Sequence, residues 1–341
     1  MSRELAKEIR AAQAARRYMR RHGINASWNN ALVVDRARQR GHEVRADDCG
    51  RVSITDGNRS RWFSSGRVSI NRLLAKRAVR YKDVASALLR AYDVRAPENA
   101  IFEIGEVDRA WAWAQDLSSA VLKPNDTEQG VMVYVGVTSR EEFVDAFEAI
   151  ENKHGKVLVE EFMPGVEHRV LVIDNEVVAA TRRVPANVVG DGRSDIPTLV
   201  QAKNKARERT KNPIHESLKL DAAAERELTK QDLSPTAVPE AGQVVYLRST
   251  SNIHTGGDAV DATDELRPEE VEFVQRAARV FTGLRVAGFD VLLPRDGQGE
   301  EPCVLEINAS PMISMHHFPS EGRPRDAAGK LVDAMFPSRA R

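Results

Sequence analysis

The spacing of apolar positions predicts a small N-terminal unit followed by a helix. In residues 3–22, Leu5, Ile9 and Ala12 recur at helical spacing among many arginines, which predicts an amphipathic helix whose basic side faces water. Residues 71–91 return to this helical spacing. Between the two helices, the strand-like apolar runs lie at 31–35, 44, 52–55 and 61–63, with the hairpin signal D-G-N-R-S before the last. We expect this small unit, α/β or rich in strands, to end near Ile70.

Strand-like and helical patterns alternate from residue 97 onward. Pro97 ends the preceding helix, and Ser139 with Glu142 three positions later has the spacing of a capping box. Asp174-Asn175 between two apolar runs predicts a hairpin. The predicted strands are 100–104, 120–124, 130–136, 156–161, 169–173 and 177–181, and the predicted helices 107–115, 139–153, 268–284 and 325–336. Such alternation, ending in antiparallel hairpins, indicates an α+β build.

Residues 199–232 are dense in charge and helical in propensity, with Asp221 as a predicted N-cap. We expect an exposed flap or a solvated pair of helices there. A strand at 244–248 follows, and then S-T-S-N-I-H-T-G-G-D, whose glycines would let the backbone approach a ligand closely. A plain turn is the alternative interpretation of this glycine pair.

The stretch 286–313 combines burial with oxygen-bearing side chains. Two apolar runs, 286–293 and 302–307, flank P-R-D-G-Q-G-E-E, which predicts a β-hairpin centred on Gln298 with Asp290 opposite Glu306. Glu306 and Asn308 then project from one face. Two carboxylates and an amide oxygen that converge between apolar residues are costly to bury without a cation, and all-oxygen ligation suits Mg²⁺. The alternative is a hairpin with one solvated face.

Composition narrows the class of protein only slightly. The 341 residues contain 50 Lys plus Arg and 50 Asp plus Glu, so net charge favours neither a nucleic-acid partner nor a membrane surface. Two cysteines, Cys49 and Cys303, argue against a disulfide framework and fit a reducing compartment. The charged N-terminus lacks a signal-peptide pattern, so we expect a cytoplasmic protein.

Lys123 ends an apolar strand and is followed by the loop N-D-T-E-Q-G. Such a loop can offer backbone N–H groups to a phosphate, and the lysine can add a point charge. A surface lysine that merely ends the strand is the alternative.

Five separated segments together carry a resemblance to a known family. They are E-E-F-M-P-G-V-E-H-R-V-L-V-I, R-R-V-P-A-N-V-V-G-D-G, L-R-S-T-S-N-I-H-T-G-G-D-A-V-D, G-F-D-V-L-L and V-L-E-I-N-A-S-P-M. In this order and spacing they resemble ATP-grasp carboxylate-amine ligases, specifically the ATP-grasp part of cyanophycin synthetases and bifunctional glutathione synthetases. The likeness covers residues 72–337 and only faintly the first 70. It implies an α+β ATP-grasp fold with a small N-terminal domain (1–71), a central and lid subdomain (72–162) and a C-terminal subdomain with the metal site (163–341).

The resemblance implies a site for ATP and two Mg²⁺ ions, with Mn²⁺ as the alternative metal. Asp290, Glu306 and Asn308 match the metal ligands, and Arg248 matches an arginine that stabilises the transferred phosphoryl group. Glu167 matches the acceptor for the ribose hydroxyls. The remaining nucleotide positions are Lys82, Lys123 and Gly130 at the phosphates, with Lys123 also catalytic, and Glu160, Glu161 and Phe162 at adenine.

One loop departs from the family pattern. The family commonly has D-G-x-x-G-x-G after the phosphate lysine, whereas this chain has Thr127 and Met132 at two of the glycine positions. Side chains there restrict backbone conformations with positive φ and narrow the approach of N–H groups to a phosphate.

The resemblance implies an ATP-dependent ligase that forms an amide bond from a carboxylate and an amine through an acyl phosphate. Amino acids or a short peptide are the expected substrates; nucleic acid and membrane are excluded as partners, and a homodimer is left open. The rival functions are a kinase that releases a stable phosphorylated product and a non-catalytic nucleotide-binding or partner-binding module. The substrate residues are predicted to be Arg169, Arg183, Asn187, Asn252, Gly256, His316 and Arg325, for which a structural role is the alternative.

Overall fold

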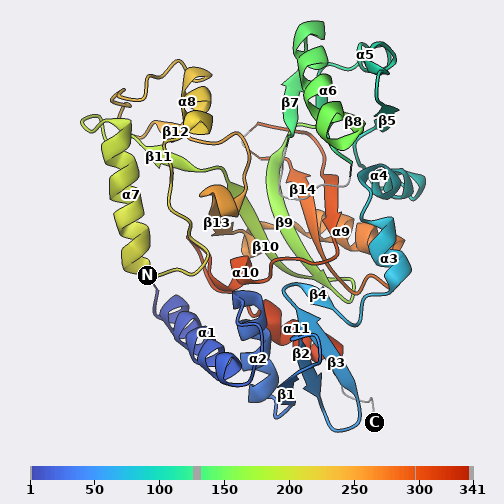
Figure 1. The fold of residues 1–341 in the computed structure, drawn as a ribbon, viewed down its shortest axis with the longest axis vertical. Helices are drawn as coiled ribbons and strands as arrows, with labels where there is room; N and C mark the ends of the chain where they lie inside the picture. Colours follow the sequence, from blue (N-terminus) through green and yellow to red (C-terminus); the bar gives the residue numbers. More distant parts are fainter. Residues whose placement is uncertain (1, 126–131, 296, 338–341) are drawn as a thin grey trace. The chain divides into compact units, whose positions relative to one another are not determined.

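The computed structural model describes residues 2–125, 132–295 and 297–337, and its chain forms two compact units (Figure 1). Unit 1 comprises Met1–Val68, Val178–Glu265 and Met312–Arg341, and unit 2 comprises Ser69–Val177 and Leu266–Pro311. The expected boundaries after residues 71 and 162 divide the chain into three consecutive domains, whereas these two units are built from separated segments. The three expected domains therefore stay a prediction. In the described ranges, no helix is long and apolar enough to cross a membrane.

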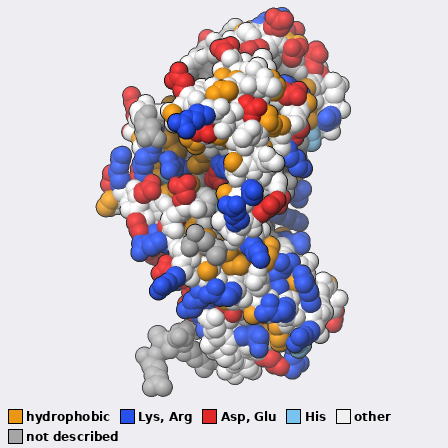
Figure 2. Space-filling model, turned by 90° about the vertical axis from the view of Figure 1, so that its left-hand side faces the viewer, with side chains coloured by type: hydrophobic (Ala, Val, Ile, Leu, Met, Phe, Trp, Pro, Cys, Tyr) orange, Lys and Arg blue, Asp and Glu red, His pale blue; other side chains and the backbone are white. Residues whose placement is uncertain are grey.

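Unit 1 begins with the predicted amphipathic helix. Ser2 caps α1 (Arg3–Arg21), and its hydroxyl accepts a hydrogen bond from the Leu5 N–H at 3.1 Å. Figure 2 shows Lys and Arg side chains gathered over the lower part of the view, where Figure 1 draws α1. The opposite, apolar face of the helix is buried: Leu5, Ile9, Ala12, Ala15 and Met19. The predicted basic, water-facing side of this helix is therefore confirmed.

The second element of unit 1 corrects one prediction. Residues 31–35 were expected to form a strand, but they lie within the helix α2 (Trp28–Gln39). Ser27 caps this helix by accepting a hydrogen bond from the Asn30 N–H at 3.2 Å. Ala31, Leu32, Val33 and Val34 are all buried, so α2 is apolar over most of its circumference. A short run of this kind has no periodicity that separates a buried helix from a strand.

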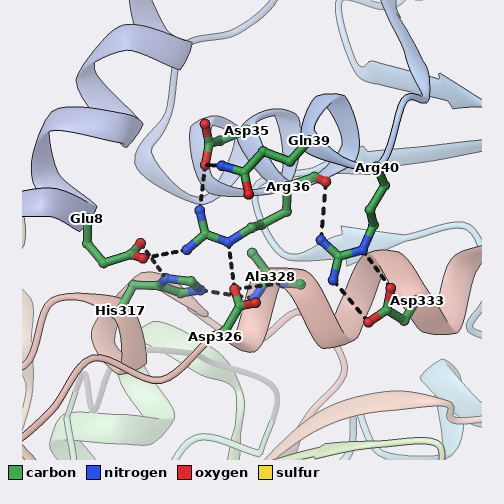
Figure 3. A network of polar contacts seen from close by, with 10 residues as sticks. Glu8, Asp35, Arg36, Gln39, Arg40, His317, Asp326, Ala328 and Asp333 are labelled. Carbon is green, nitrogen blue, oxygen red and sulfur yellow. Dashed lines mark hydrogen bonds and ion pairs between the residues drawn. The ribbon is translucent and has the colours of Figure 1, made fainter. Parts of the chain in front are cut away.

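A meander and a polar network complete the N-terminal part of unit 1. The antiparallel strands β1 to β4 lie in sequence order: β1 (Glu43–Ala46), β2 (Val52–Thr55), β3 (Ser60–Ser64) and β4 (Arg67–Val68). In Figure 1, α2 lies beside the C-terminal helix α11 (Ala327–Met335). Figure 3 shows the Arg36 guanidinium between three carboxylates, those of Asp35 (2.5 Å), Glu8 (2.5 Å) and Asp326 (2.7 Å).

His317 joins this network in a defined tautomer. Its Nε2 accepts a hydrogen bond from the Ala328 N–H at 2.9 Å, so the neutral ring carries its proton on Nδ1, 3.2 Å from the Glu8 carboxylate. Residues from both ends of the chain thus share one polar network around the buried side chains of Arg36 and His317.

The rest of unit 1 contains a pair of helices over the stretch 199–232, one of the two expected forms, but these helices are only partly solvated. The inward faces of α7 and α8 are buried, with Ile196, Val200 and Leu228 in an apolar cluster that also contains Val245. Asp221 caps α8, as predicted. The elements are β10 (Glu176–Val184), β11 (Asn187–Val189), α7 (Ile196–Thr210), α8 (Ala222–Thr229), β12 (Val244–Tyr246), η1 (Ile253–Thr255), β13 (Asp258–Asp261), η2 (Thr263–Glu265) and α10 (Ser314–His317). β10 pairs with β13 and β11 with β12, both antiparallel.

In unit 2, a four-stranded antiparallel sheet in the order β5-β8-β6-β7 packs against two helices. Ser139 caps α6, as predicted, and accepts from the Glu142 N–H at 3.2 Å. Phe143 and Phe147 on this helix are fully buried in the cluster beneath the sheet. The elements are β5 (Asn99–Glu103), α5 (Val107–Ala114), β6 (Ala120–Lys123), β7 (Tyr134–Val137), α6 (Arg140–His154) and β8 (Lys156–Glu161).

The second sheet of unit 2 contains the predicted hairpin. The strands β9 (Val166–Ile173), β14 (Val286–Leu293) and β15 (Cys303–Asn308) pair antiparallel, with β14 between β9 and β15. Its other helices are α3 (Leu73–Ala78), α4 (Lys82–Ala91) and α9 (Pro268–Val280). The single helix expected over residues 71–91 is therefore two helices, since Val79 ends α3 and Tyr81 precedes α4.

Candidate active site

The structure confirms the predicted register of the hairpin. Asp290 on β14 lies opposite Glu306 on β15, and Gly288 lies opposite Asn308. Every residue of β14 is buried, so the alternative of a hairpin with one solvated face is wrong for this strand.

A β-bulge at Leu305 decides which side chains share a face. Asp290 pairs with Glu306 but Val291 pairs with Val304, so Leu305 is an extra residue on β15. Beyond the bulge, Cys303 pairs with Leu292. Since positions 290 and 292 of β14 face the same way, Cys303 and Glu306 lie on one face of the sheet although they are three residues apart.

The neighbouring strand β9 adds two predicted residues to this face. Glu167 lies opposite Leu292, and Arg169 lies opposite Asp290. The predicted ribose acceptor and the three predicted metal ligands therefore project from one side of the β9–β14–β15 sheet. We call Glu167, Arg169, Asp290, Glu306 and Asn308 the carboxylate face.

Two cations accompany the carboxylates of this face. Arg169 donates two hydrogen bonds to Asp290, one from Nε to Oδ1 and one from Nη2 to Oδ2 at 2.9 Å, and each residue is only 6% exposed. Burial opposes the charge of Arg169, but attraction to Asp290 and then to Glu306 outweighs it, so the pKa of Arg169 lies above its ordinary value. Lys82 Nζ lies 3.9 Å from Glu306 Oε2. Arg169, expected to bind substrate, thus contacts a predicted metal ligand.

The donor set of the carboxylate face fits Mg²⁺ in chemistry. Asp290, Glu306 and Asn308 offer only oxygen, which Mg²⁺ prefers, and Glu306 and Asn308 remain partly exposed. Among the residues that the structure describes, no group of three His, Cys, Asp or Glu side chains is arranged to hold a metal. The predicted set contains only two carboxylates, and its third oxygen donor is the amide of Asn308.

The predicted nucleotide residues on the other sheet of unit 2 also lie together. Lys123 Nζ donates a hydrogen bond to the Glu160 carboxylate, and both residues are buried. The N–H groups of Glu161 and Phe162 donate to Glu98 O (2.9 Å) and Ser119 O (3.2 Å). Those two backbone donors are thus used within the protein.

An apolar cluster escaped the sequence analysis. Met163, Leu292 and Cys303 are buried together, and Leu305 packs against them. Burial raises the pKa of the Cys303 thiol to about 12, so it behaves as an apolar side chain. The only signal in the sequence is the apolar character of each strand, which any core shares.

The loop that departs from the family pattern is described only at its end. Gly130 and Thr127, with the rest of 126–131, lie outside the described residues. Met132 has φ of +54°, a left-handed conformation typical of glycine, and its side chain packs against the cluster around Phe143. At this one position the backbone keeps a glycine-like conformation despite the side chain.

The other predicted site residues belong to unit 1, where each has partners. Arg248 Nη2 donates to Asp221 at 2.8 Å, and His316 Nδ1 lies 2.8 Å from the Thr181 hydroxyl. Arg325 binds both Asp261 (2.7 Å) and Asp264 (2.8 Å), which keeps the pKa of these two carboxyls below their ordinary values. Arg183 lies on β10, Asn187 on β11, and Asn252 and Gly256 flank η1. Their roles at a site stay a prediction.

Lys203 and Arg207 of α7 contact some of these predicted substrate residues. The charge density of this segment in the sequence did not indicate such contacts. Arg207 donates to Gly256 O at 2.9 Å and to Asp258 at 2.7 Å. Lys203 donates to the other oxygen of Asp258 (2.7 Å) and to the Asn187 side chain (3.1 Å). Burial opposes ionisation of Asp258, but Lys203 and Arg207 lower its pKa overall. The α7 helix therefore fixes the loop that contains Gly256.

Comparison with known proteins shows which class this fold defines. The chain has the α+β ATP-grasp fold, as predicted. It superposes on a bifunctional glutathione synthetase from Pasteurella multocida with a TM-score of 0.68 and 27% identity, over 94% of this chain and 46% of that one. No family model matches the sequence.

The predicted resemblance in sequence is confirmed as well. The chain is 34% identical to cyanophycin synthetase of Trichormus variabilis over 263 residues, which are 75% of this chain and 29% of that protein. It is 33% identical to the glutathione biosynthesis bifunctional protein GshAB of Clostridium perfringens over 295 residues, 84% of this chain and 38% of that protein. The chain thus spans less than half the length of these relatives.

Proposed function

We propose that the chain is an ATP-dependent carboxylate-amine ligase that forms an amide bond through an acyl phosphate. The observation that carries this proposal is the carboxylate face, on which Asp290 and Glu306 lie opposite each other with Lys82 3.9 Å from Glu306. Acidic oxygen donors beside a lysine are the groups that a polyphosphate with its divalent cation requires. Homology to cyanophycin synthetases and glutathione-synthesising proteins supports amide formation as the reaction.

The proposed reaction has two steps. A carboxylate oxygen of the acid attacks the γ-phosphorus of ATP, the bond to the β,γ-bridging oxygen breaks, and ADP leaves. The amine nitrogen then attacks the acyl carbon, the bond from that carbon to the phosphate oxygen breaks, and phosphate leaves as the nitrogen loses a proton. Neither step needs a covalent enzyme nucleophile, so positioning and electrostatics carry the catalysis.

The residues of unit 2 suit the nucleotide. Lys82 and Lys123 would offer point charges to the phosphates, and Glu167 would accept from the ribose hydroxyls in the row beside the metal donors. The apolar cluster of Met163, Leu292, Cys303 and Leu305 adjoins that row and would contact the base. Asp290, Glu306 and Asn308 would hold Mg²⁺, which supplies charge neutralisation at the phosphates when bound.

The remaining predicted residues would bind the acid and the amine. Arg248 is proposed to stabilise charge on the transferred phosphoryl group, and Arg183, Asn187, Asn252, Gly256, His316 and Arg325 are the proposed substrate residues. Amino acids or a short peptide are the proposed substrates, because arginines pair well with their carboxylates. Two unpaired cysteines, Cys49 and Cys303, support the cytoplasm as the compartment.

Supplying acid and amine separately and together tests the proposal. Pairs of amino acids and short peptides are screened with Mg·ATP for ADP and phosphate, and the products are weighed by mass spectrometry. We expect phosphate release to require both partners and the product mass to equal acid plus amine minus water. A stable phosphorylated acid formed without amine would instead identify a kinase, and nucleotide binding without turnover for any pair would identify a binding module.

A further inference from the structure

The contact between Arg169 and Asp290 depends on a missing side chain at position 288. A Cβ atom there would lie 2.8 Å from Cδ of Arg169 and 3.1 Å from Cβ of Pro311. A Cβ essentially never approaches another carbon as closely as 2.8 Å, so a larger residue would displace the arginine. Gly288 thus leaves the space through which Arg169 crosses from β9 toward Asp290.

This arrangement balances the charge of the predicted metal donors. Asp290 is buried and would be costly to ionise alone, but Arg169 binds both of its oxygens. Glu306 is partly exposed and has Lys82 3.9 Å away. Of the three carboxylates on this face, the two predicted metal donors Asp290 and Glu306 therefore each face a cation before any metal or phosphate is present. A free divalent cation would meet a nearly neutral group, whereas nucleotide phosphates would add the missing negative charge.

We propose that Arg169 is a positioning residue that orients and charge-balances Asp290, so that the carboxylate face binds its divalent cation together with nucleotide phosphates rather than as the free ion. This inference rests on the proposed function and deepens it. It assigns Arg169 to the metal side of the site, where the sequence had suggested a substrate contact.

Binding of Mn²⁺, followed through the electron paramagnetic resonance signal of the free ion, tests the inference without relying on activity. The affinity of the intact chain for Mn²⁺ is measured alone and with ADP, and the ratio of the two affinities is the coupling between metal and nucleotide. We expect ADP to raise the affinity of the unmodified protein by about 100-fold or more. In Arg169→Gln we expect the coupling to fall by about 10-fold, because the free ion then meets an unbalanced carboxylate.

Two further variants keep the test decisive. Gly288→Ala retains the arginine but obstructs its path, so it should lower the coupling in the same direction even if Arg169→Gln folds poorly. Arg285→Gln is the matched control, because Arg285 also binds an aspartate, Asp174, with two hydrogen bonds (2.6 and 2.7 Å) but at a half-exposed position of unit 2. Its coupling should equal that of the unmodified protein.

The outcomes separate the inference from the proposed function. Unchanged coupling in both Arg169→Gln and Gly288→Ala, with Mn·ADP still bound, would overturn the role of Arg169 and leave the ligase proposal standing. Failure of the unmodified protein to bind Mn²⁺ with or without nucleotide would overturn both.

Discussion

Lys123 and Glu160 form a buried ion pair across β6 and β8, next to the segment predicted to meet adenine. The resemblance in sequence assigns Lys123 to the phosphates and Glu160 to adenine, and in the structure the two side chains form an ion pair. A buried charge that loses its partner is strongly destabilising, whereas a pair replaced as a whole is often tolerated. This difference allows the structural and the nucleotide-binding parts of the pair to be measured apart.

We predict that Lys123→Met lowers the free energy of unfolding by about 3 kcal/mol, because Glu160 is left buried without its cation. Adding Glu160→Met to this variant should restore most of the loss, since no uncompensated charge remains. Urea unfolding of the two single variants and the double variant gives the coupling energy. Additive losses in this cycle would contradict the prediction.

Glu306→Gln should remove ligation while leaving the fold intact. The amide cannot supply the negative charge that a divalent cation requires, so turnover should fall by about 100-fold or more. Glu306 is partly exposed, and the unfolding midpoint should change little. Glu301→Gln, a change at an exposed acid just before β15, is the control and should retain full activity. Ligation retained by Glu306→Gln would refute the metal assignment.

The network around Arg36 predicts a dependence of stability on pH. Burial raises the pKa values of Glu8 and Asp326, but both lie below their ordinary values overall, because hydrogen bonds and attraction from Arg36, and for Glu8 the hydrogen bond from His317, outweigh burial. Carboxyls with lowered pKa contribute stability that is fully present above their unfolded values, about 4, and is lost as the pH falls through the folded values.

Arg36→Met should therefore cost about 3 kcal/mol at pH 7, and its difference from the unmodified protein should shrink as the pH is lowered toward 3. Urea unfolding at several pH values measures this. Arg40→Met is the control, because Arg40 pairs with Asp333 at a more exposed position (Figure 3) and should cost less than about 1 kcal/mol. A difference for Arg36→Met that grows in acid would contradict the assignment.

Arg207→Gln should affect the acid or amine rather than ATP. Arg207 holds Gly256 O and Asp258 in place, so its loss would loosen the loop that contains the predicted substrate residues. We expect the KM of one non-nucleotide substrate to rise by about 10-fold and that of ATP to stay within about twofold. Arg209→Gln, on the exposed side of the same helix, should behave like the unmodified enzyme. A rise confined to the KM of ATP would point to a different role for α7.

The parts of the fold that were predicted correctly are those with a local signal. The Ser139 cap and the pairing of Asp290 with Glu306 follow from spacing and turn chemistry within a few residues. The run around Val33 was misassigned because its helix is buried on nearly every side. No local rule distinguishes such a helix from a strand.

The missing parts of the candidate site are those that depend on distant neighbours. Arg207 was expected in water because charge-dense segments usually are solvated, yet its partners lie about 50 residues further along the chain. Arg169 was expected to bind substrate, since nothing in the sequence indicates that Gly288 opens a path to Asp290. Pairing of this kind becomes visible only when the strands lie side by side.

The bulge at Leu305 gives one residue control over a site in which it has no chemical part. Leu305 lies between Cys303 and Glu306. If it were deleted, one of these two side chains would point to the opposite face of the sheet, although every functional residue would still be present in the sequence. Replacement of Leu305 by another apolar residue keeps the number of residues in β15 unchanged. Natural variation in this hairpin should therefore tolerate exchanges at position 305 and exclude deletions there, so we expect the length of β15 to be kept as strictly as Glu306.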